Sequence, residues 1–334
     1  MKFNIARQPL VPAFLTLAAI TALAMWKVPL TGEFNPENLA IPTHGVFAVK
    51  TLEELLGEFQ GAFPGWTRAI GALLMLFTGM SLGRLTLRYN LYSVGTCLAI
   101  PLYAAFTAGL ALEGGLLQML VANTLLAFSV KNFARSFCNG YAFDALFRAS
   151  LYLGILLLTA PAALPLVALL PLAIILFHRT LRESVVALAG FLLPILAFGY
   201  VNWGAGGDFT APFEQAVEAF TNGSALEAAR AIPIPNLILL GALLLLDLLA
   251  LFFFLADSYA AGNKPRAIFI FQIFLLILLI PTLLNPVSTS GEILLLAVPS
   301  AILIPFLLVR IHRLPTLILY LLLTLGSLST LLLQ

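Results

Sequence analysis

The chain has 334 residues, of which 61% are hydrophobic and only 10% are charged. Soluble globular proteins carry charge on about a quarter of their residues. This composition, with a mean hydropathy of +1.04, therefore excludes a soluble globular protein and predicts a polytopic membrane protein. Seventeen Lys and Arg residues against fifteen Asp and Glu residues leave a formal charge of +2. That balance provides no basic face for phosphate neutralisation and excludes nucleic acid as a partner.

Long apolar runs, bounded by charged residues or by Gly, Pro and Asn, predict an all-α transmembrane helix bundle. A spanning helix needs about 20 mainly apolar residues, and this criterion gives about 11 spans. In chain order the expected spans are 11–30, 66–82, 92–112, 115–130, 146–160, 163–178, 184–203, 234–256, 267–284, 292–309 and 315–333. The fourth to sixth are short and contain Pro161, Pro165 and Pro171. A re-entrant pair is the alternative there to two full crossings.

The distribution of Lys and Arg predicts the orientation of the chain, because short cytoplasmic loops collect these residues. With the N-terminus inside, thirteen of them fall on the cytoplasmic side, and Lys27, Lys50, Arg68 and Arg230 fall outside. We therefore expect an N-in, C-out topology. Residues 1–334 are treated as one integral membrane domain with two long external loops, 31–65 and 204–232.

Both external loops contain patterns typical of short amphipathic helices. In Thr51–Phe63 the apolar residues recur at helical spacing, with Glu53, Glu54, Glu58 and Gln60 on the opposite face. This pattern predicts a helix lying on the outer leaflet. In the second loop, Ser224-Ala225-Leu226-Glu227 has the form of a capping box that begins another short helix.

Asp247 lies in a run of leucines near the middle of an expected span. An aspartate at the centre of a spanning helix costs about 2.5–3.5 kcal/mol on insertion scales, so its carboxyl should face the protein interior. It is either a proton, ion or headgroup site, or a structural residue hydrogen-bonded to a neighbouring helix. The structural interpretation is favoured, because no second acid or base is evident at its depth.

Glu33 and Glu37 follow the first span directly and are candidate catalytic residues. Carboxylates at a membrane surface can act as a general base or hold a divalent metal, the one cofactor that the sequence suggests. Arg68, two residues after Trp66, is a candidate for binding a lipid phosphate. The competing interpretation is an ordinary solvated loop followed by interfacial anchoring.

The most polar cytoplasmic stretch runs from Lys131 to Arg148. Asp144 and Arg148 are four residues apart and should form an ion pair on one helix face. The favoured interpretation of this stretch is a positive-inside anchor with a local ion pair.

Motifs in the middle third of the chain resemble an uncharacterised multi-pass inner-membrane protein family of Bacteroidota. The motifs are Asn123-Thr124-Leu125-Leu126, Asn132-Phe133, Phe143-Asp144-Ala145-Leu146-Phe147, Tyr152-Leu153-Gly154, Phe177-His178-Arg179-Thr180-Leu181-Arg182-Glu183 and Gly190-Phe191-Leu192-Leu193-Pro194. This resemblance implies location in a bacterial cytoplasmic membrane and supplies no activity.

The expected architecture is also similar to that of GT-C-type glycosyltransferases, polytopic enzymes that use polyprenyl-phosphate-linked sugars. The likeness lies in an N-in first span followed by an acidic external loop, in Pro-broken middle spans, and in a basic turn at His178–Arg182. The acidic pair of those enzymes is usually tighter than Glu33 and Glu37, which are four residues apart. A likeness of architecture alone does not establish function.

Three functional hypotheses follow. The leading one is a GT-C-like protein that binds or transfers a lipid-linked sugar at the outer leaflet, with Glu33 or Glu37 as base or metal ligand and Arg68 at the lipid phosphate. The second is a non-catalytic subunit or scaffold of a cell-envelope assembly, which would bind a protein partner through its external helices. The third is a small-solute transporter, a function that Asp247 alone favours.

Overall fold

The computed structural model describes residues 5–27, 47–111, 115–214, 217, 232–256, 262–283 and 290–333. These residues form helices and connecting turns, and no strand occurs among them. The helices are η1 (Ile5–Arg7), α1 (Leu10–Lys27), α2 (Leu52–Ala62), α3 (Pro64–Arg88), α4 (Ala99–Leu110), α5 (Leu116–Ser136), α6 (Phe143–Thr159), η3 (Pro161–Ala168), α7 (Leu169–Leu176), α8 (Leu181–Gly204), α11 (Ile234–Ala256), α12 (Asn263–Leu283), η4 (Ser290–Leu296), α13 (Ala297–Arg310) and α14 (Arg313–Leu333). The predicted all-α fold class is therefore confirmed.

Within the described residues, eight helical segments are long and apolar enough to cross a membrane, and the chain is a multi-pass membrane protein. They are α1, α3, α5, α8, α11, α12, the segment Gly291–Arg310 and α14. Three expected spans correspond to shorter helices: 92–112 to α4, 146–160 to α6, and 163–178 to η3 with α7. Length and hydropathy thus support eight spans, and the count of about 11 stays a prediction.

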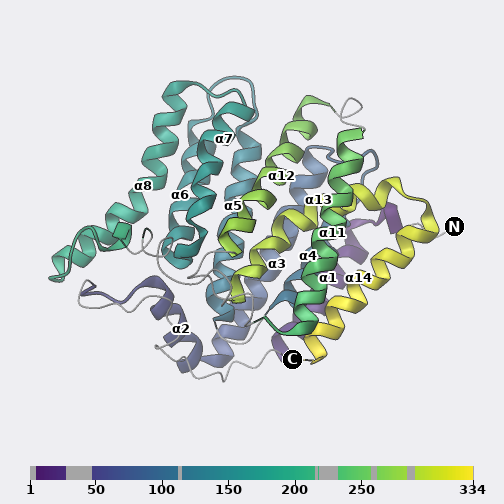
Figure 1. Ribbon diagram of the computed structural model, residues 1–334, viewed down its shortest axis with the longest axis horizontal. Coiled ribbons are helices and arrows are strands. Elements are labelled where there is room, and N and C mark those ends of the chain that lie inside the picture. The colour runs from purple at the N-terminus through teal and green to yellow at the C-terminus, as the bar shows by residue number, and fades with distance from the viewer. Residues whose placement is uncertain are drawn as a thin grey trace.

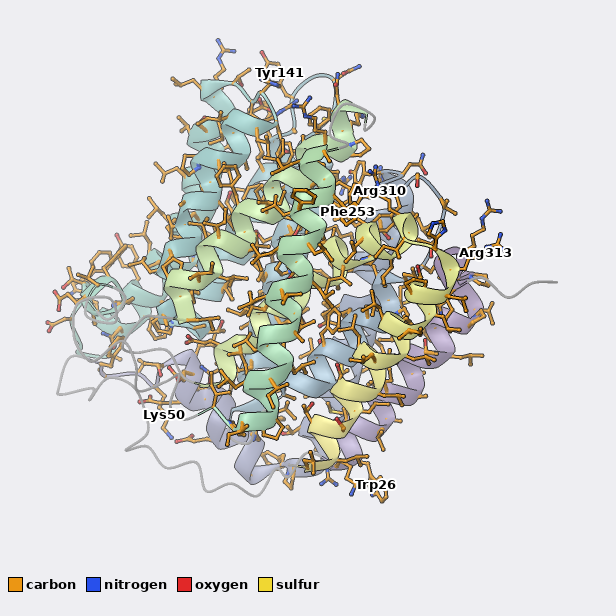
Figure 2. The ribbon with its side chains drawn as sticks, turned by 45° about the vertical axis from the view of Figure 1, so that its right-hand side comes forward. Trp26, Lys50, Tyr141, Phe253, Arg310 and Arg313 are labelled. Atoms are coloured by element: carbon orange, nitrogen blue, oxygen red, sulfur yellow. The ribbon has the colours of Figure 1, made fainter. Side chains whose placement is uncertain are left out.

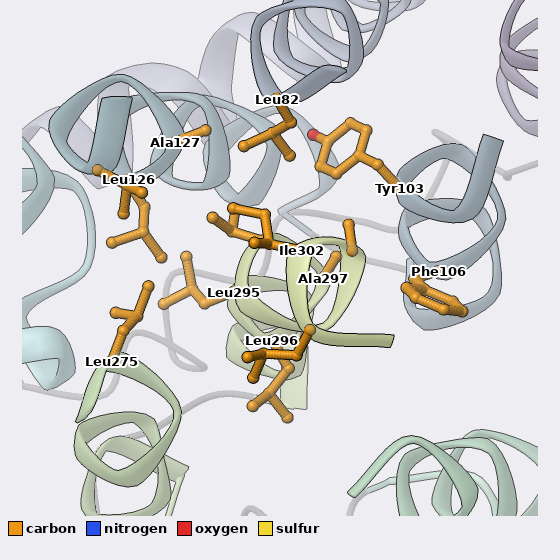
Figure 3. Packing of buried hydrophobic residues seen from close by; sticks show 14 of the residues in the cluster. Leu82, Tyr103, Phe106, Leu126, Ala127, Leu275, Leu295, Leu296, Ala297 and Ile302 are labelled. Atoms are coloured by element: carbon orange, nitrogen blue, oxygen red, sulfur yellow. The ribbon is translucent and has the colours of Figure 1, made fainter. Parts of the chain in front are cut away.

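Helix α13 forms the centre of the bundle (Figure 1). Together with η4, which precedes it, α13 makes up most of the long segment Gly291–Arg310. This segment is 94% buried, the largest fraction among the eight long segments. Helix α13 packs against α3, α4, α5, α11, α12 and α14. Figure 3 shows Leu295, Ala297 and Ile302 of this segment among side chains from α3, α4, α5 and α12. Apolarity alone does not distinguish this helix, since α8, α11 and α14 are about as apolar and are far less buried; its central position follows from its contacts with helices on every side.

Helices α6 and α8 form the most extensive pair, at one edge of the bundle (Figure 1). Their backbones approach closely at two glycines. A Cβ atom on Gly154 would lie 2.3 Å from the carbonyl oxygen of Phe191, and one on Gly190 would lie 2.7 Å from that of Phe147. Small residues allow this approach in membrane helices, where dispersion contacts between helices replace the hydrophobic effect. The opposite face of α8 carries exposed apolar residues, as a lipid-facing helix would.

The predicted helix over residues 51–63 is confirmed as α2, and its position on the outer leaflet stays a prediction. Thr51 and Glu54 form a reciprocal capping box at its start. Its most buried residues are Gly57 and Gln60, whereas Leu55 is exposed. The Gln60 Oε1 atom accepts a hydrogen bond of 3.0 Å from the backbone N–H of Leu117. Gln60 is turned inward because it satisfies an N–H of the first turn of α5, where no helical partner exists, whereas Glu58 of the same polar face is exposed.

The helix ends gather into two groups. At one end, which we call the basic end, the backbone N–H of Cys97 donates to the carbonyl of Gln8, and Arg179 donates to the carbonyl of Cys138. At the opposite end, Asn236 and Thr330 both donate to the carbonyl of Gly109. The basic end carries twelve of the described Lys and Arg residues: Arg7, Arg84, Arg88, Lys131, Arg135, Arg148, Arg179, Arg182, Lys264, Arg266, Arg310 and Arg313. Figure 2 shows Arg310 and Tyr141 on this side, with Trp26 and Lys50 on the other.

Candidate functional site

The residues predicted to form an outer-leaflet site are not brought together by the described part of the chain. Glu33 and Glu37 lie outside the described residues, as does the Ser224–Glu227 capping box. Arg68 lies exposed in the first turns of α3, at the end opposite the basic end. Its proposed roles, and those of the two glutamates, stay predictions.

Asp247 lies in α11 with its side chain fully buried, as its insertion cost leads one to expect. Its Oδ2 atom accepts a hydrogen bond of 2.6 Å from the Ser300 hydroxyl on α13. The Oδ1 atom has no hydrogen-bond partner. This contact joins α11 to the central helix, which agrees with the structural interpretation, and a role in ion or substrate binding stays a prediction.

No group of three or more His, Cys, Asp or Glu side chains that could hold a metal ion occurs within the described residues. Cys97 and Cys138 are both free thiols. The divalent metal suggested by Glu33 and Glu37 concerns residues outside this part of the chain. It stays a prediction.

A hollow of about 380 Å³ lies at the basic end, between the last turns of α3 and α5. Two arginines of α3, Arg84 and Arg88, line it together with Lys131 and Arg135 of α5. Each pair is spaced by four residues, so both members project from one helix face. The hollow is also lined by Arg148 and by the polar side chains of Asn132, Tyr89 and Tyr152.

An apolar groove of about 800 Å³ shares Arg84, Arg88 and Lys131 with this hollow. Its remaining lining comes from α1, α3, α4 and α5 and consists of Leu10, Phe77, Met80, Ser81, Leu87, Ile100 and Phe128. Along α3 the lining changes from Phe77 through Ser81 to Arg84 and Arg88, which is a change from apolar to cationic toward the basic end. The groove thus joins an apolar wall to a cationic rim.

A third hollow, of about 500 Å³, adjoins the first through Arg88, Arg135 and Tyr89. Lys264 lines it, with its ammonium 5.6 Å from the ring centre of Phe137. Burial raises the pKa of the Tyr89 hydroxyl, although Arg88 and Arg135 act in the opposite direction. At neutral pH this hydroxyl therefore keeps its proton and can donate a hydrogen bond.

The charge in these three hollows is not neutralised by the protein. No Asp or Glu is among the residues that line them. The predicted ion pair between Asp144 and Arg148 is confirmed, with a separation of 2.8 Å, so Arg148 is the one lining cation with a carboxylate partner among the described residues. Within the described residues, Arg84, Arg88, Lys131 and Arg135 form no ion pair. Four unpaired cations around one hollow are the arrangement that binds phosphate groups.

The loop between α5 and α6 is fixed next to the hollows by Arg179 and Glu183. The Arg179 guanidinium donates to the carbonyls of Cys138 and Gly140, at 2.8 and 2.9 Å. The Glu183 carboxylate accepts from the backbone N–H groups of Ala142 and Thr180, at 2.6 and 2.9 Å. These contacts hold in place the loop that supplies Phe137 and Cys138 to the third hollow.

Comparison with protein-family models, with curated proteins and with solved structures finds no match to this chain.

The sequence interpretation assigned Lys131 and Arg135 to a membrane anchor, counted Arg84 and Arg88 only toward the topology, and did not recognise the convergence of the four. A signal was present in the spacing. Arg84 with Arg88, and Lys131 with Arg135, are two like-charge pairs at i and i+4, a spacing that destabilises a helix by a few tenths of a kcal/mol. Two such pairs in helices that pack on one another place four like charges around one hollow.

Proposed function

We propose that this multi-pass membrane protein binds a lipid that carries a phosphate group, with the headgroup at the basic end and the hydrocarbon chain in the apolar groove. The observation that carries the proposal is the continuity of groove and hollow through Arg84, Arg88 and Lys131. A soluble phosphate compound would need the cations and would not need the apolar wall. A lipid uses both.

The energetics favour the same class of ligand. Each basic residue near a membrane surface attracts anionic lipid by about 1 kcal/mol. Four cations around one hollow supply several times this amount, against the cost of ordering the headgroup and four long side chains. A lipid-linked sugar phosphate belongs to this ligand class, so glycosyl transfer stays a second proposal, which rests on Glu33, Glu37 and Arg68.

The topology that we propose places the basic end in the cytoplasm. It combines the eight long spans with α4, α6 and the η3–α7 segment, which gives eleven crossings, an internal N-terminus and an external C-terminus. The support is the location of twelve described cations at one end, against Lys27, Lys50 and Arg68 at the other. The inner membrane of a bacterium is the location proposed from the motif resemblance.

Single-cysteine labelling tests this topology. On a background in which Cys97 and Cys138 are serine, an impermeant maleimide applied to intact cells should modify cysteine at Glu58 and leave cysteine at Asn139 unmodified. Permeabilised cells should show labelling at both positions, which controls for reactivity. Labelling of Asn139 in intact cells would reverse the proposed orientation.

Lipid binding is tested by native mass spectrometry of the detergent-purified protein titrated with phosphatidylglycerol. Arg84→Gln with Arg88→Gln should weaken binding about a hundredfold or more, because two charge-assisted contacts are lost, each worth about 1.5–3 kcal/mol. The matched control is Arg182→Gln with Arg313→Gln, which removes the same charge from exposed positions at the same end that line none of the three hollows. If both double variants weaken lipid binding equally, the weakening comes from the loss of general surface charge, and the proposed site is refuted.

A further inference from the structure

One residue of the groove wall, Ser81, has a buried hydroxyl that forms no hydrogen bond within the protein. The Ser81 side chain lines the groove, is 7% exposed, and its hydroxyl has no hydrogen-bond partner. Serine and threonine inside helices commonly donate to the carbonyl one turn earlier. Ser150 and Thr124 do so here, at 2.8 and 2.7 Å. An unpartnered buried hydroxyl costs about 1–3 kcal/mol, so an acceptor supplied by a ligand in the groove would stabilise the Ser81 hydroxyl.

Other buried hydroxyls without a partner do not share this location. Thr21 and Thr67 are equally unpartnered, yet they line none of the three hollows. Ser81 combines two independent observations, an unsatisfied donor and a place in the wall of a ligand-sized groove. It is therefore the residue that can distinguish one bound lipid from another.

The depth of Ser81 along α3 indicates which class of lipid would have a hydrogen-bond acceptor beside it. Ser81 precedes Arg84 by three residues on α3, which places it about 4.5 Å deeper along the helix axis. In a glycerophospholipid, the glycerol unit separates the phosphate from the acyl ester oxygens by a few covalent bonds. In a polyprenyl phosphate, hydrocarbon begins directly at the phosphate ester. An acceptor at the level of Ser81, below a phosphate at the level of Arg84 and Arg88, exists only in the first class.

Resting on the proposed function, we infer that the groove binds an anionic acyl glycerophospholipid, with the Ser81 hydroxyl donating a hydrogen bond to an acyl ester oxygen. The phosphate contacts Arg84 and Arg88 at the mouth, and an acyl chain lies along Phe77 and Phe128. In this arrangement the cations determine that a phosphate is bound. Ser81 determines that an ester-linked lipid is preferred.

The test compares two singly charged phosphodiester lipids on the delipidated full-length protein in detergent micelles. Phosphatidylglycerol has acyl esters, whereas dihexadecyl phosphate has the same type of phosphate and long chains without them. The wild-type protein should bind phosphatidylglycerol about fivefold more tightly, as expected for one hydrogen bond. Ser81→Ala should remove this preference by weakening phosphatidylglycerol alone. Ser329→Ala, which removes a hydroxyl on α14 that bonds only to its own helix, is the control.

Each outcome separates the inference from the proposed function. If Ser81→Ala leaves the preference intact, the inference about the ester is wrong while lipid binding stands. If Arg84→Gln with Arg88→Gln weakens neither lipid, the proposed function itself fails. Tighter binding of a polyprenyl phosphate than of phosphatidylglycerol, unchanged in Ser81→Ala, would identify the other lipid class as the occupant. Displacement of phosphatidylglycerol by inorganic phosphate at equal concentration would show that a free anion is the ligand and would overturn the inference.

Discussion

Gly154→Ala is expected to destabilise the folded protein by roughly 3 kcal/mol, at the upper range for overpacking a tight interface. The added Cβ would lie 2.3 Å from the Phe191 carbonyl oxygen and 2.6 Å from the Pro194 ring. Both are parts of α8 that cannot rotate away, so the two helices must separate. The thermal midpoint of detergent-purified protein, followed by fluorescence-detected size-exclusion chromatography, measures the effect.

Gly241→Ala is the matched control for this substitution. Gly241 lies inside α11, is exposed, and has no atom within 4 Å of its would-be Cβ. Alanine in an open helical position stabilises a helix by up to about 1 kcal/mol relative to glycine, so the midpoint should stay equal or rise. The two variants thus differ in the sign of the expected change. A midpoint for Gly154→Ala at or above the wild-type value would contradict the close approach of α6 and α8.

Glu183→Ala is expected to cost about 3–5 kcal/mol, the range for removing one partner of a buried ion pair. The Glu183 carboxylate is 1% exposed and lies 3.5 Å from the Arg179 guanidinium. Its loss would leave the N–H groups of Ala142 and Thr180 without their acceptor and would release the loop next to the third hollow. Thermal midpoint and hydrogen exchange of residues 138–142 measure the two consequences.

Glu183→Gln keeps the shape and one acceptor oxygen, so it should lose roughly half as much stability and keep most of the loop protection. Arg182→Ala alters the exposed neighbouring residue and should change neither quantity. Wild-type exchange rates at residues 138–142 in Glu183→Ala would show that this carboxylate does not hold the loop.

The sequence predicted the elements of the fold well where hydropathy and length act together. The eight long helices follow from runs of apolar residues that no soluble fold would expose to water. The helix in 51–63 followed from periodicity and formed as expected. The burial of Gln60 could not be predicted, because it depends on the N–H of Leu117, which is distant in sequence and needs an acceptor.

The candidate site could not be predicted for a related reason. Periodicity places Arg84 with Arg88, and Lys131 with Arg135, on one face of their own helices, and it says nothing of which helices become neighbours. The packing of α3 against α5 brings the four cations together, and the positive-inside rule accounts for each of them singly. The interior position of Asp247 could be predicted, because the free-energy cost of a charged side chain that faces lipid is enough to require it.

The central position of α13 has a consequence for biosynthesis. The segment that fills the middle of the bundle begins at residue 291, so most of the helices that surround it are made first. At 5–20 residues per second, the ribosome needs roughly 10–35 s to proceed from the end of α5 to the end of α13. During this interval α5 is already inserted, with the side chains that will face α13 in contact with lipid or with an insertion factor. Premature termination before residue 290 would leave the sides of α4, α11 and α12 that pack against α13 without their partner helix.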